Sequence, residues 1–198
     1  PSEHWLDTEI SSWHNTLKIE VDVQEDNRFL CSEKEFQEWA KDKKKLMMEN
    51  FYRLLRKKHN ILMNGEKPLG GKWNYDTENR KPASDSQNIP KPYHHAPDDV
   101  TKQVARYADK HFADHFGDTE PFQFAVTRLQ ALQALKSFID QRLKFFGTYQ
   151  DAMLQDEPWM FHSHIGLYLN IGLLLPLECI EAAEQAYRDK KAPINSAE

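Results

Sequence analysis

The chain has 198 residues, 39% hydrophobic and 12% aromatic, with a formal net charge of −5 and two cysteines. The length and hydrophobic content predict a globular protein with one or two modest cores, and two cysteines are too few for a disulfide framework. The negative net charge argues weakly against a protein that coats nucleic acids in general. The longest apolar window, residues 165–177, contains an asparagine and two glycines and falls short of the ~20 residues of a membrane span, and no secretory leader pattern occurs, so we expect a cytoplasmic protein without a membrane partner.

The first twenty-odd residues combine a helical and a strand pattern. Trp5, Ile10 and Trp13 recur at near-helical spacing, and Leu17–Val23 then alternates apolar and charged side chains as a strand does. A lone strand cannot satisfy its own backbone hydrogen bonds. Because the sequence offers no partner strand and opens on Pro1, we expect an internal fragment that lacks the amino-terminal part of an α/β sheet.

Two helices are predicted next. Ser32 and Glu35 have the spacing of a capping box at the start of the first. The second is expected to place four apolar residues on one face: Met47, Phe51, Leu54 and Leu55.

Eight lysines and arginines lie between Lys41 and Lys58, together with two acidic residues. This basic run is either a solvated helix face or a surface for nucleic-acid phosphates.

A long loop is expected from Asn60 to Pro97, where periodicity lapses and glycines and prolines recur. Loops of this length in a compact domain are usually linkers or functional segments. Trp73 and Tyr75 would expose large apolar faces on a flexible tether. We therefore expect an ordered crossover that packs along the protein.

After Pro97 the pattern is wholly helical. Asp98 or Asp99 is expected to cap one helix, and Thr127 the next. The buried stripe predicted for the first helix is Val100, Val104, Tyr107, Ala108, His111 and Phe112, and that for the second is Leu129, Leu132, Leu135, Phe138, Ile139 and Leu143. Two further helices are expected over residues 159–175 and 176–190. The predicted fold class is mainly α.

His111 and His115 stand at i and i+4, a spacing that could bind a divalent metal from one helix face and so support a metal-dependent hydrolase. No glutamate follows His111, and Phe112 and Phe116 flank the pair as in an ordinary amphipathic helix. We therefore predict no metal site in this chain. Neither cysteine has a partner at C-x-x-C spacing for thiol chemistry.

A polar cluster lies before the last apolar run. Its first part is expected at the end of one helix and consists of Tyr149, Gln150 and Asp151. Its second part, His162 and Ser163 after Trp159, is expected at the start of the next helix, where free N–H groups favour an anion such as pyrophosphate. The pattern also fits a capped core helix with satisfied polar groups, and the residues alone leave both interpretations open.

Four blocks of the sequence resemble the cryptochrome/photolyase family: GGKWNYDTENRKP, HFGDTEPF, FGTYQDAM and WMFHSHIGLYLNIGLLLP. The resemblance runs from about Asp26 to Ser196 and is specific to the prokaryotic, iron–sulfur-containing, (6-4) photolyase-like branch, also called deoxyribodipyrimidine photolyase-related proteins. It implies that residues 1–60 end an α/β antenna domain, residues 61–97 form an interdomain loop, and residues 98–198 begin the all-helical domain that holds bent FAD.

The resemblance also implies FAD-binding residues. In the wider family the segment T-S-x-L-S-P-Y-L-x-x-G binds the FAD phosphates, and a tyrosine some dozen residues earlier touches the cofactor. The positions of this chain that match, together with the two polar residues after the tyrosine, are Tyr149, Gln150, Asp151, His162, Ser163, Ile165 and Gly166. Gly166 lacks the hydroxyl of the family's second serine, and its backbone N–H is expected to substitute.

The function implied by the resemblance is that of a light-driven DNA photolyase, in which excited reduced FAD donates an electron to a pyrimidine photoproduct of the (6-4) type. It implies three cofactors: FAD, a 4Fe-4S cluster with ligands beyond this chain, and an antenna chromophore such as a lumazine. We expect damaged DNA as the partner of a monomer, and an inactive fragment. A blue-light cryptochrome photoreceptor and a cofactor-free helical interaction module are the alternatives.

Overall fold

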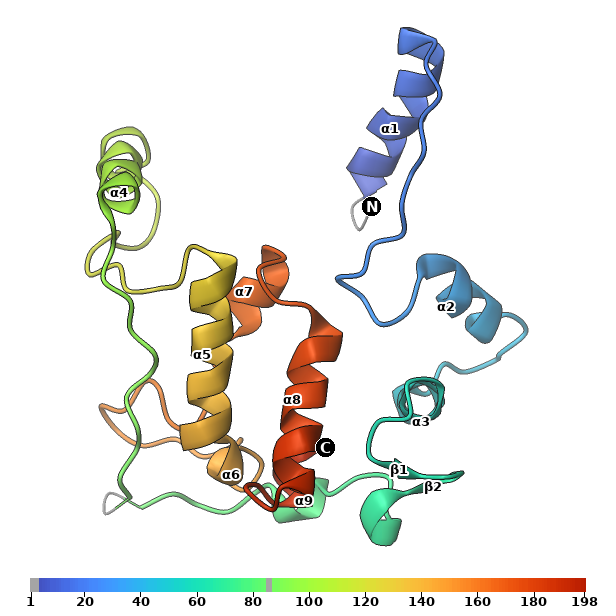
Figure 1. The fold of residues 1–198 in the computed structure, drawn as a ribbon, viewed down its shortest axis with the longest axis vertical. Helices are drawn as coiled ribbons and strands as arrows, with labels where there is room; N and C mark the ends of the chain where they lie inside the picture. The colour runs from blue at the N-terminus through green and yellow to red at the C-terminus, as the bar shows by residue number, and fades with distance from the viewer. Residues whose placement is uncertain (1–3, 85–86) are drawn as a thin grey trace. The chain divides into compact units, whose positions relative to one another are not determined.

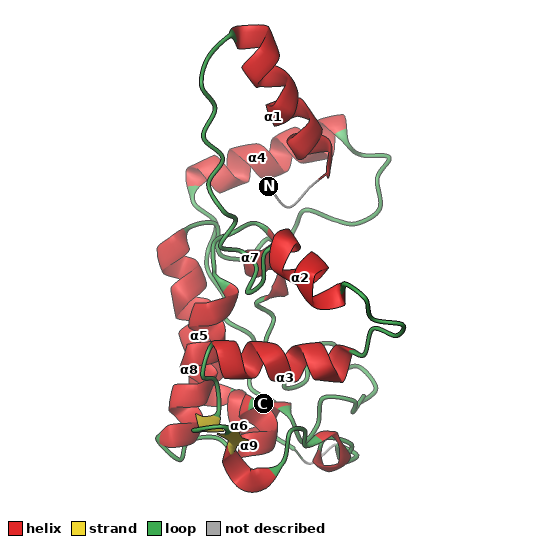
Figure 2. Ribbon diagram, turned by 90° about the vertical axis from the view of Figure 1, so that its right-hand side faces the viewer, coloured by secondary structure: helices red, strands yellow, loops and turns green. Residues whose placement is uncertain are grey.

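The computed structural model describes residues 4–84 and 87–198, which fall into two compact units, Pro1–His59 and Asn60–Glu198. The described residues are mainly helical, as predicted for the chain as a whole, and their strands form one small antiparallel pair (Figure 1, Figure 2). None of the helices in the described ranges has the length and apolar character needed to cross a membrane.

The first unit is built from α1 His4–Leu17, α2 Glu33–Ala40 and α3 Met48–Lys58. The predicted capping box of α2 is confirmed: the Ser32 hydroxyl accepts from the Glu35 backbone N–H (3.2 Å), and the Ser32 N–H donates to the Glu35 carboxylate (3.0 Å). An aromatic cluster of Phe36, Trp39 and Phe51 joins α2 to α3, with the Trp39 and Phe51 ring centroids 4.7 Å apart.

The predicted strand Leu17–Val23 is wrong. Leu17 is the last residue of α1, Lys18 takes a φ of 53°, and the residues that follow are not in a strand. A strand persists only where a neighbour satisfies its N–H and C=O groups, and the described residues of this unit contain no second strand. Ile19 and Val23, which would share one face of the strand, are accordingly exposed.

The predicted apolar face of α3 is only partly correct. Phe51 and Leu55 are half-buried, but Met47 and Leu54 are exposed. The buried residue of this helix is Arg56, whose guanidinium lies 5.5 Å from the centroid of the Tyr52 ring on the preceding turn. The stem of an arginine can cover apolar surface in this way.

The second unit starts with the long loop, which is ordered wherever it is described. The loop contains β1 Met63–Asn64 paired with β2 Lys67–Pro68, followed by the short 3₁₀ helices η1 Leu69–Gly71 and η2 Asp76–Glu78. Tyr75 is buried and Trp73 half-buried, which confirms the expected packing of this segment. Residues 85–86 of the predicted crossover lie outside the described residues.

The helices of the second unit are α4 Asp99–His111, α5 Arg128–Gln141, α6 Leu143–Phe146, α7 Gly166–Asn170, α8 Pro176–Arg188 and α9 Ile194–Ala197. Both predicted N-caps are confirmed: Asp98 accepts from the N–H of Thr101 (2.8 Å), and Thr127 forms a capping box with Gln130. The core lies where α5 packs against α6 and α8, and α9 closes it against α6 and α8 (Figure 1).

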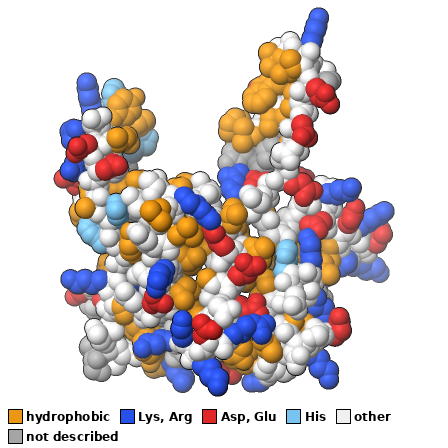
Figure 3. Space-filling model, in the orientation of Figure 1, with side chains coloured by type: hydrophobic (Ala, Val, Ile, Leu, Met, Phe, Trp, Pro, Cys, Tyr) orange, Lys and Arg blue, Asp and Glu red, His pale blue; other side chains and the backbone are white. Residues whose placement is uncertain are grey.

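The predicted buried stripe of α4 is wrong. No described side chain of this helix is buried, and Val100, Val104, Tyr107 and Phe112 are each more than half exposed. Hydrophobic side chains accordingly gather on the surface of α4 (Figure 3). The apolar stripe is real, but no described element packs against it closely enough to bury it.

The predicted inward face of α5 is wrong only near the start of the helix. Leu135, Phe138 and Leu143 are buried and Ile139 is half-buried, as expected, whereas Leu129 and Leu132 are exposed. The fully buried residue on the first turn is Ala131 instead, a small side chain that lets α8 approach α5. Periodicity predicted the helix, but the choice between neighbouring faces depends on the size of the side chain that the partner helix meets.

The predicted helix over residues 159–175 is also wrong, because only α7 within it is helical. Met160 and His164 take φ values of 47° and 55°, which interrupt a helix, and Gly172 at 72° ends α7. The N–H groups of the two residues after Gly172 donate to the carbonyl of Tyr168 (2.8 and 3.1 Å). The apolar run therefore folds back on itself, while Ile165 and Tyr168 still reach the core.

Candidate functional site

The turn that carries Tyr149 follows α6 directly. The N–H of Tyr149 donates to the carbonyl of Phe145 (3.1 Å), and the N–H of Ala152 donates to the carbonyl of Tyr149 (3.0 Å). Tyr149 is half-buried, whereas Gln150 and Asp151 are exposed. The amide and carboxylate of the turn are therefore available to a ligand at the surface.

A buried network of amides and hydroxyls holds this turn from behind. The Asn195 side-chain amide donates to Asn79 Oδ1 (2.9 Å) and to Thr148 Oγ1 (3.3 Å), and the Gly147 N–H donates to Ser196 Oγ (3.0 Å). A Cβ on Gly147 would lie 2.0 Å from the Asn195 carbonyl oxygen, so only glycine fits here. The position of the turn is thus set by residues far away in the sequence.

The second candidate segment, Trp159–Gly166, is irregular rather than the start of a long helix. His162 and Ser163 are half-buried, Ile165 is buried and Gly166 is exposed at the first position of α7. The N–H of His162 approaches the carbonyl of Trp159 at 3.4 Å. The expected dipole of a long helix is therefore absent at these residues, and their contribution to anion binding is limited to local donors.

Aromatic packing brings the two segments together. The ring of Phe161, next to His162, lies 5.4 Å from the ring of Tyr149 and 5.0 Å from that of Phe145. Such tilted contacts fix ring positions as well as burying area. The structure thus places Tyr149 beside the segment that carries His162 and Ser163, while Gln150 and Asp151 extend from the exposed side of the turn.

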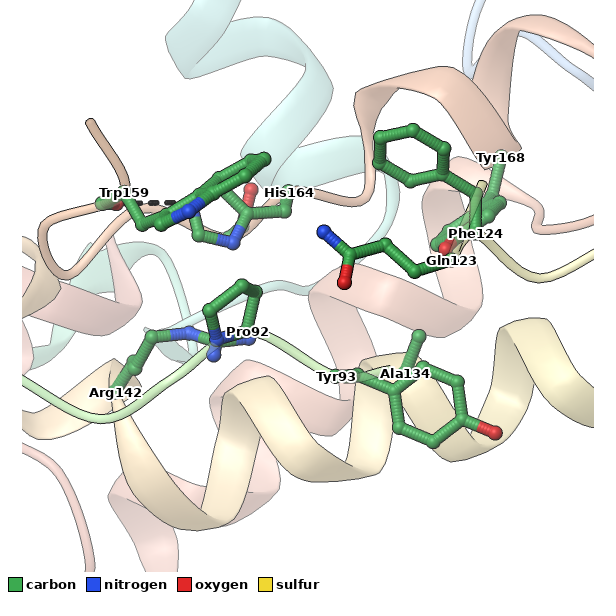
Figure 4. Close-up of a pocket in the computed structure, with 10 residues that line it drawn as sticks. Pro92, Tyr93, Gln123, Phe124, Ala134, Arg142, Trp159, His164 and Tyr168 are labelled. Atoms are coloured by element: carbon green, nitrogen blue, oxygen red, sulfur yellow. Dashed lines mark hydrogen bonds between the residues drawn. The ribbon is translucent and has the colours of Figure 1, made fainter. Parts of the chain in front are cut away.

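Ser163 is one of the residues that line a small cavity of about 20 Å³, and Figure 4 shows Arg142, Trp159 and His164 around the same cavity. Its wall includes Arg142, Trp159, Ser163 and His164, and also Gln123. The volume suits one water-sized group and cannot take a phosphate. Any larger ligand must therefore meet Ser163 from the exposed side.

Burial changes the acid–base properties of the cavity wall. Burial lowers the pKa of His164, against the effect of its hydrogen bond to the Trp159 carbonyl, and the nearby charge of Arg142 lowers it further. Burial also lowers the pKa of Arg142. The pKa of the Tyr168 hydroxyl is raised by burial, although that hydroxyl accepts from the N–H of Ala125 (3.0 Å). His164 and Tyr168 are thus held neutral near pH 7.

The chemistry of the candidate groups suits the parts of FAD. The Ser163 hydroxyl and an N–H at the start of α7 are donors that suit phosphate oxygens, and the Gln150 and Asp151 side chains can accept from sugar hydroxyls. Apart from its chain neighbours and the backbone of its own helix, nothing lies within 4 Å of the place where a Cβ on Gly166 would stand, so a ligand can approach this backbone closely.

The other candidates are not assembled into sites. His115 pairs with Asp114 (3.3 Å) on the surface, and the His111 ring lies 4.2 Å from that of Tyr107. Within the described ranges no three His, Cys, Asp or Glu side chains gather as metal ligands would. In the basic run Lys43–Lys45 are exposed, with Lys43 lying over the Trp39 ring at 5.0 Å.

Arg142 and His164 were not predicted from the sequence as members of the candidate site. A signal for Arg142 existed, because it continues the buried stripe of α5 four residues after Phe138 and four before Phe146. A charged side chain is rarely buried unless it has a polar partner, so its presence in this stripe indicates a specific interaction. His164 had no comparable signal, since its importance depends on a φ that the sequence does not reveal.

Comparisons with known proteins give a consistent result. The family described as deoxyribodipyrimidine photo-lyase-related protein matches residues 1–124. A (6-4) photolyase of Agrobacterium fabrum is 47% identical over 198 residues, which are 100% of this chain and 39% of that protein. An uncharacterized protein of Acanthamoeba polyphaga mimivirus is 31% identical over 85 residues, 41% of this chain and 43% of that protein. The chain therefore spans about two fifths of the Agrobacterium relative.

Proposed function

Because the chain belongs to the family of deoxyribodipyrimidine photolyase-related proteins, as its sequence motifs predicted, we propose that it is part of a flavin-dependent, light-driven DNA photolyase. The observation that carries the proposal is the 47% identity to a (6-4) photolyase over the whole chain. We infer from that relative's name that the substrate is DNA with a pyrimidine photoproduct of the (6-4) type. The proposal includes a monomer with damaged DNA as its partner.

In this proposal residues 1–60 end an antenna domain, residues 61–97 connect the domains, and residues 98–198 begin the helical domain that binds FAD. When bound in its reduced form, FAD would supply the light-driven chemistry, namely the loan of one electron to the lesion and its recovery after the bonds have rearranged. The protein residues bind and orient it. His162, Ser163 and the Gly166 N–H would hold the pyrophosphate.

The remaining candidate residues have supporting roles in the proposal. Tyr149, packed on Phe161, would form one wall of the cofactor site, and Ile165 would anchor the phosphate segment in the core. Gln150 and Asp151 would accept hydrogen bonds from ribityl or ribose hydroxyls. Asp151 belongs on that side, because a carboxylate beside the pyrophosphate would be repelled.

The residues of this chain do not fit a 4Fe-4S cluster. Such a cluster is held by about four cysteine thiolates, and the chain has two, Cys31 and Cys179. Burial raises the pKa of Cys179 to about 11, which disfavours the thiolate that a metal requires. A cluster in the whole protein would need ligands outside this chain, and an antenna chromophore such as a lumazine would likewise have to be sought in the whole protein.

The proposal is tested by light-dependent repair. The full-length protein that contains this chain is incubated with reduced FAD and with DNA carrying either a (6-4) photoproduct or a cyclobutane dimer, in blue light and in the dark. We expect loss of the (6-4) photoproduct in light only. Flavin photochemistry without repair of either lesion would contradict the photolyase assignment and support a cryptochrome photoreceptor.

A further inference from the structure

Two buried nitrogen atoms beside the predicted phosphate segment have no hydrogen-bond partner. They are Nε of Arg142 and Nδ1 of His164, and both residues line the cavity of about 20 Å³ (Figure 4). Arg142 is 1% exposed, and its Nη1 donates to the carbonyl of Lys91 (3.0 Å). Leaving a buried donor or acceptor unsatisfied is costly, so each of these atoms requires an explanation.

The two atoms are complementary, one a donor and the other an acceptor. Arginine Nε always carries a hydrogen. His164 Nε2 lies 2.9 Å from the carbonyl oxygen of Trp159, which can only accept, so Nε2 must carry the ring hydrogen. In the neutral ring Nδ1 is then a lone-pair acceptor. Burial favours that neutral form by lowering the pKa of His164.

The size of the cavity and its polar wall limit what can satisfy both atoms. A volume of about 20 Å³ holds one water-sized group, and Gln123 and Ser163 offer further polar atoms in the wall. A halide could accept from Arg142 Nε–H, but it would face the lone pair of His164 Nδ1. A water molecule can accept from the first and donate to the second.

We propose that this cavity is the binding site of a single structural water that accepts from Arg142 Nε–H and donates to His164 Nδ1. Through this water, Arg142 and His164 act as positioning residues for the neighbouring segment His162–Ser163. The ring of His164 is already tied to Trp159, and the water fixes its other nitrogen to the buried Arg142. His164 can then hold its φ of 55°, which keeps the backbone next to Ser163 in place. The positioning role rests on the proposed FAD function, but the water site does not.

The water is tested directly in a high-resolution crystal structure of the full-length protein, grown once in sodium chloride and once in sodium bromide. We expect an ordered water about 2.7–3.2 Å from both nitrogens in both crystals. An anomalous bromide peak at this position, or two nitrogens without a shared water, would overturn the proposal. Nitrogen-15 NMR of His164 gives a second check: the hydrogen should lie on Nε2, and the reverse tautomer counts against the site.

The positioning role is tested with a matched pair of variants. Asparagine in His164→Asn tolerates a positive φ, and its side chain has a hydrogen-bond donor and a hydrogen-bond acceptor. Leucine in His164→Leu keeps a similar side-chain volume but has no hydrogen-bonding group and does not favour a positive φ. We expect FAD affinity in the full-length protein to fall about tenfold in His164→Leu and at most about threefold in His164→Asn. Equal losses would refute the positioning role.

The outcomes separate the two proposals. Amide hydrogen exchange over residues 159–166, measured without FAD, should be faster in His164→Leu than in His164→Asn. If the wild-type protein binds no FAD but shows the water and this exchange difference, the proposed function fails and the water site stands. If FAD binds normally and the water is missing, the water site fails alone.

Discussion

Ser163 is the residue with which the FAD assignment can be tested most locally. It is half-buried between the small cavity and the surface, and its side chain is uncharged. We expect Ser163→Asp in the full-length protein to lower FAD affinity at least about tenfold, because a carboxylate beside pyrophosphate is repelled. Isothermal titration with FAD measures the change.

Ser163→Asn is the matched control for this prediction. It has the size of aspartate without the charge, so it should lose less affinity than Ser163→Asp, and raising the salt concentration should narrow the difference between them. Similar affinities for the two variants at low salt would show that phosphate does not lie beside residue 163.

Individual residues also show where prediction from sequence reaches its limit. Ser32, Asp98 and Thr127 were identified as caps because capping depends on residues three or four apart. Arg142 and His164 were missed as a pair because they meet only in the folded chain, where both line one cavity. Local chemistry was predictable, and the convergence of distant polar atoms was not.

At the scale of elements, the turn after α6 depends on Gly147. In Gly147→Ala the new methyl would collide with the backbone of Asn195, whose carbonyl also accepts from the Asn79 amide. We expect a loss of about 3 kcal/mol in the free energy of unfolding, measured by urea denaturation. Gly166→Ala is the control, since its methyl would enter open space, and it should change stability by less than about 0.5 kcal/mol. Comparable losses in both variants would show that the close contact with Asn195 does not hold the turn.

The start of α8 depends on an ion pair that pH can break. Both oxygens of Glu178 accept from the Arg128 guanidinium, and one also accepts from the N–H of Leu175 (2.6 Å). The hydrogen bonds from Arg128 lower the pKa of Glu178, against its partial burial. A lowered folded-state pKa stabilises the fold above the ordinary value of 4.5, and this stability is lost as pH falls through the folded-state value.

We therefore expect Glu178→Gln to lose about 1 kcal/mol of stability at pH 7, a modest value because Arg128 is half exposed. The difference in stability from wild type should shrink as pH falls below the ordinary value of 4.5 and through the lowered folded-state pKa of Glu178, where the wild-type carboxylate loses its charge. Chemical denaturation of both proteins at about pH 7, 5 and 3.5 measures this difference in the free energy of unfolding. A difference that stays constant with pH would mean that the charge of Glu178 does not contribute.

Elements were predicted unevenly for physical reasons. The positions of α1, α4, α5 and α8 followed from apolar periodicity and caps, which are local. The strand Leu17–Val23 and the helix over 159–175 were predicted from local pattern as well, but a strand needs a partner, and positive φ values interrupt the second run. The exposed face of α4 shows the same limit, because amphipathicity predicts a face and not what covers it.

For the whole molecule, the family was predictable because several of its sequence motifs are long, and the match to the family over residues 1–124 confirms it. The FAD site stays a prediction: the structure packs Tyr149 against Phe161, while the cavity lined by Ser163 has a volume of only about 20 Å³. Ligand sites usually bury most of their ligand, so the 198 residues alone should bind little flavin and no iron. Iron analysis and the visible spectrum of the isolated chain check this expectation.

The most direct test of the account is the flavin content of the full-length protein that contains this chain. It is purified from flavin-rich cells, and released FAD is quantified per protein by absorption in the blue and by fluorescence after denaturation. The account predicts close to one FAD per protein, with a marked loss in Ser163→Asp. A correctly folded, colourless protein that also fails to take up added FAD would contradict it.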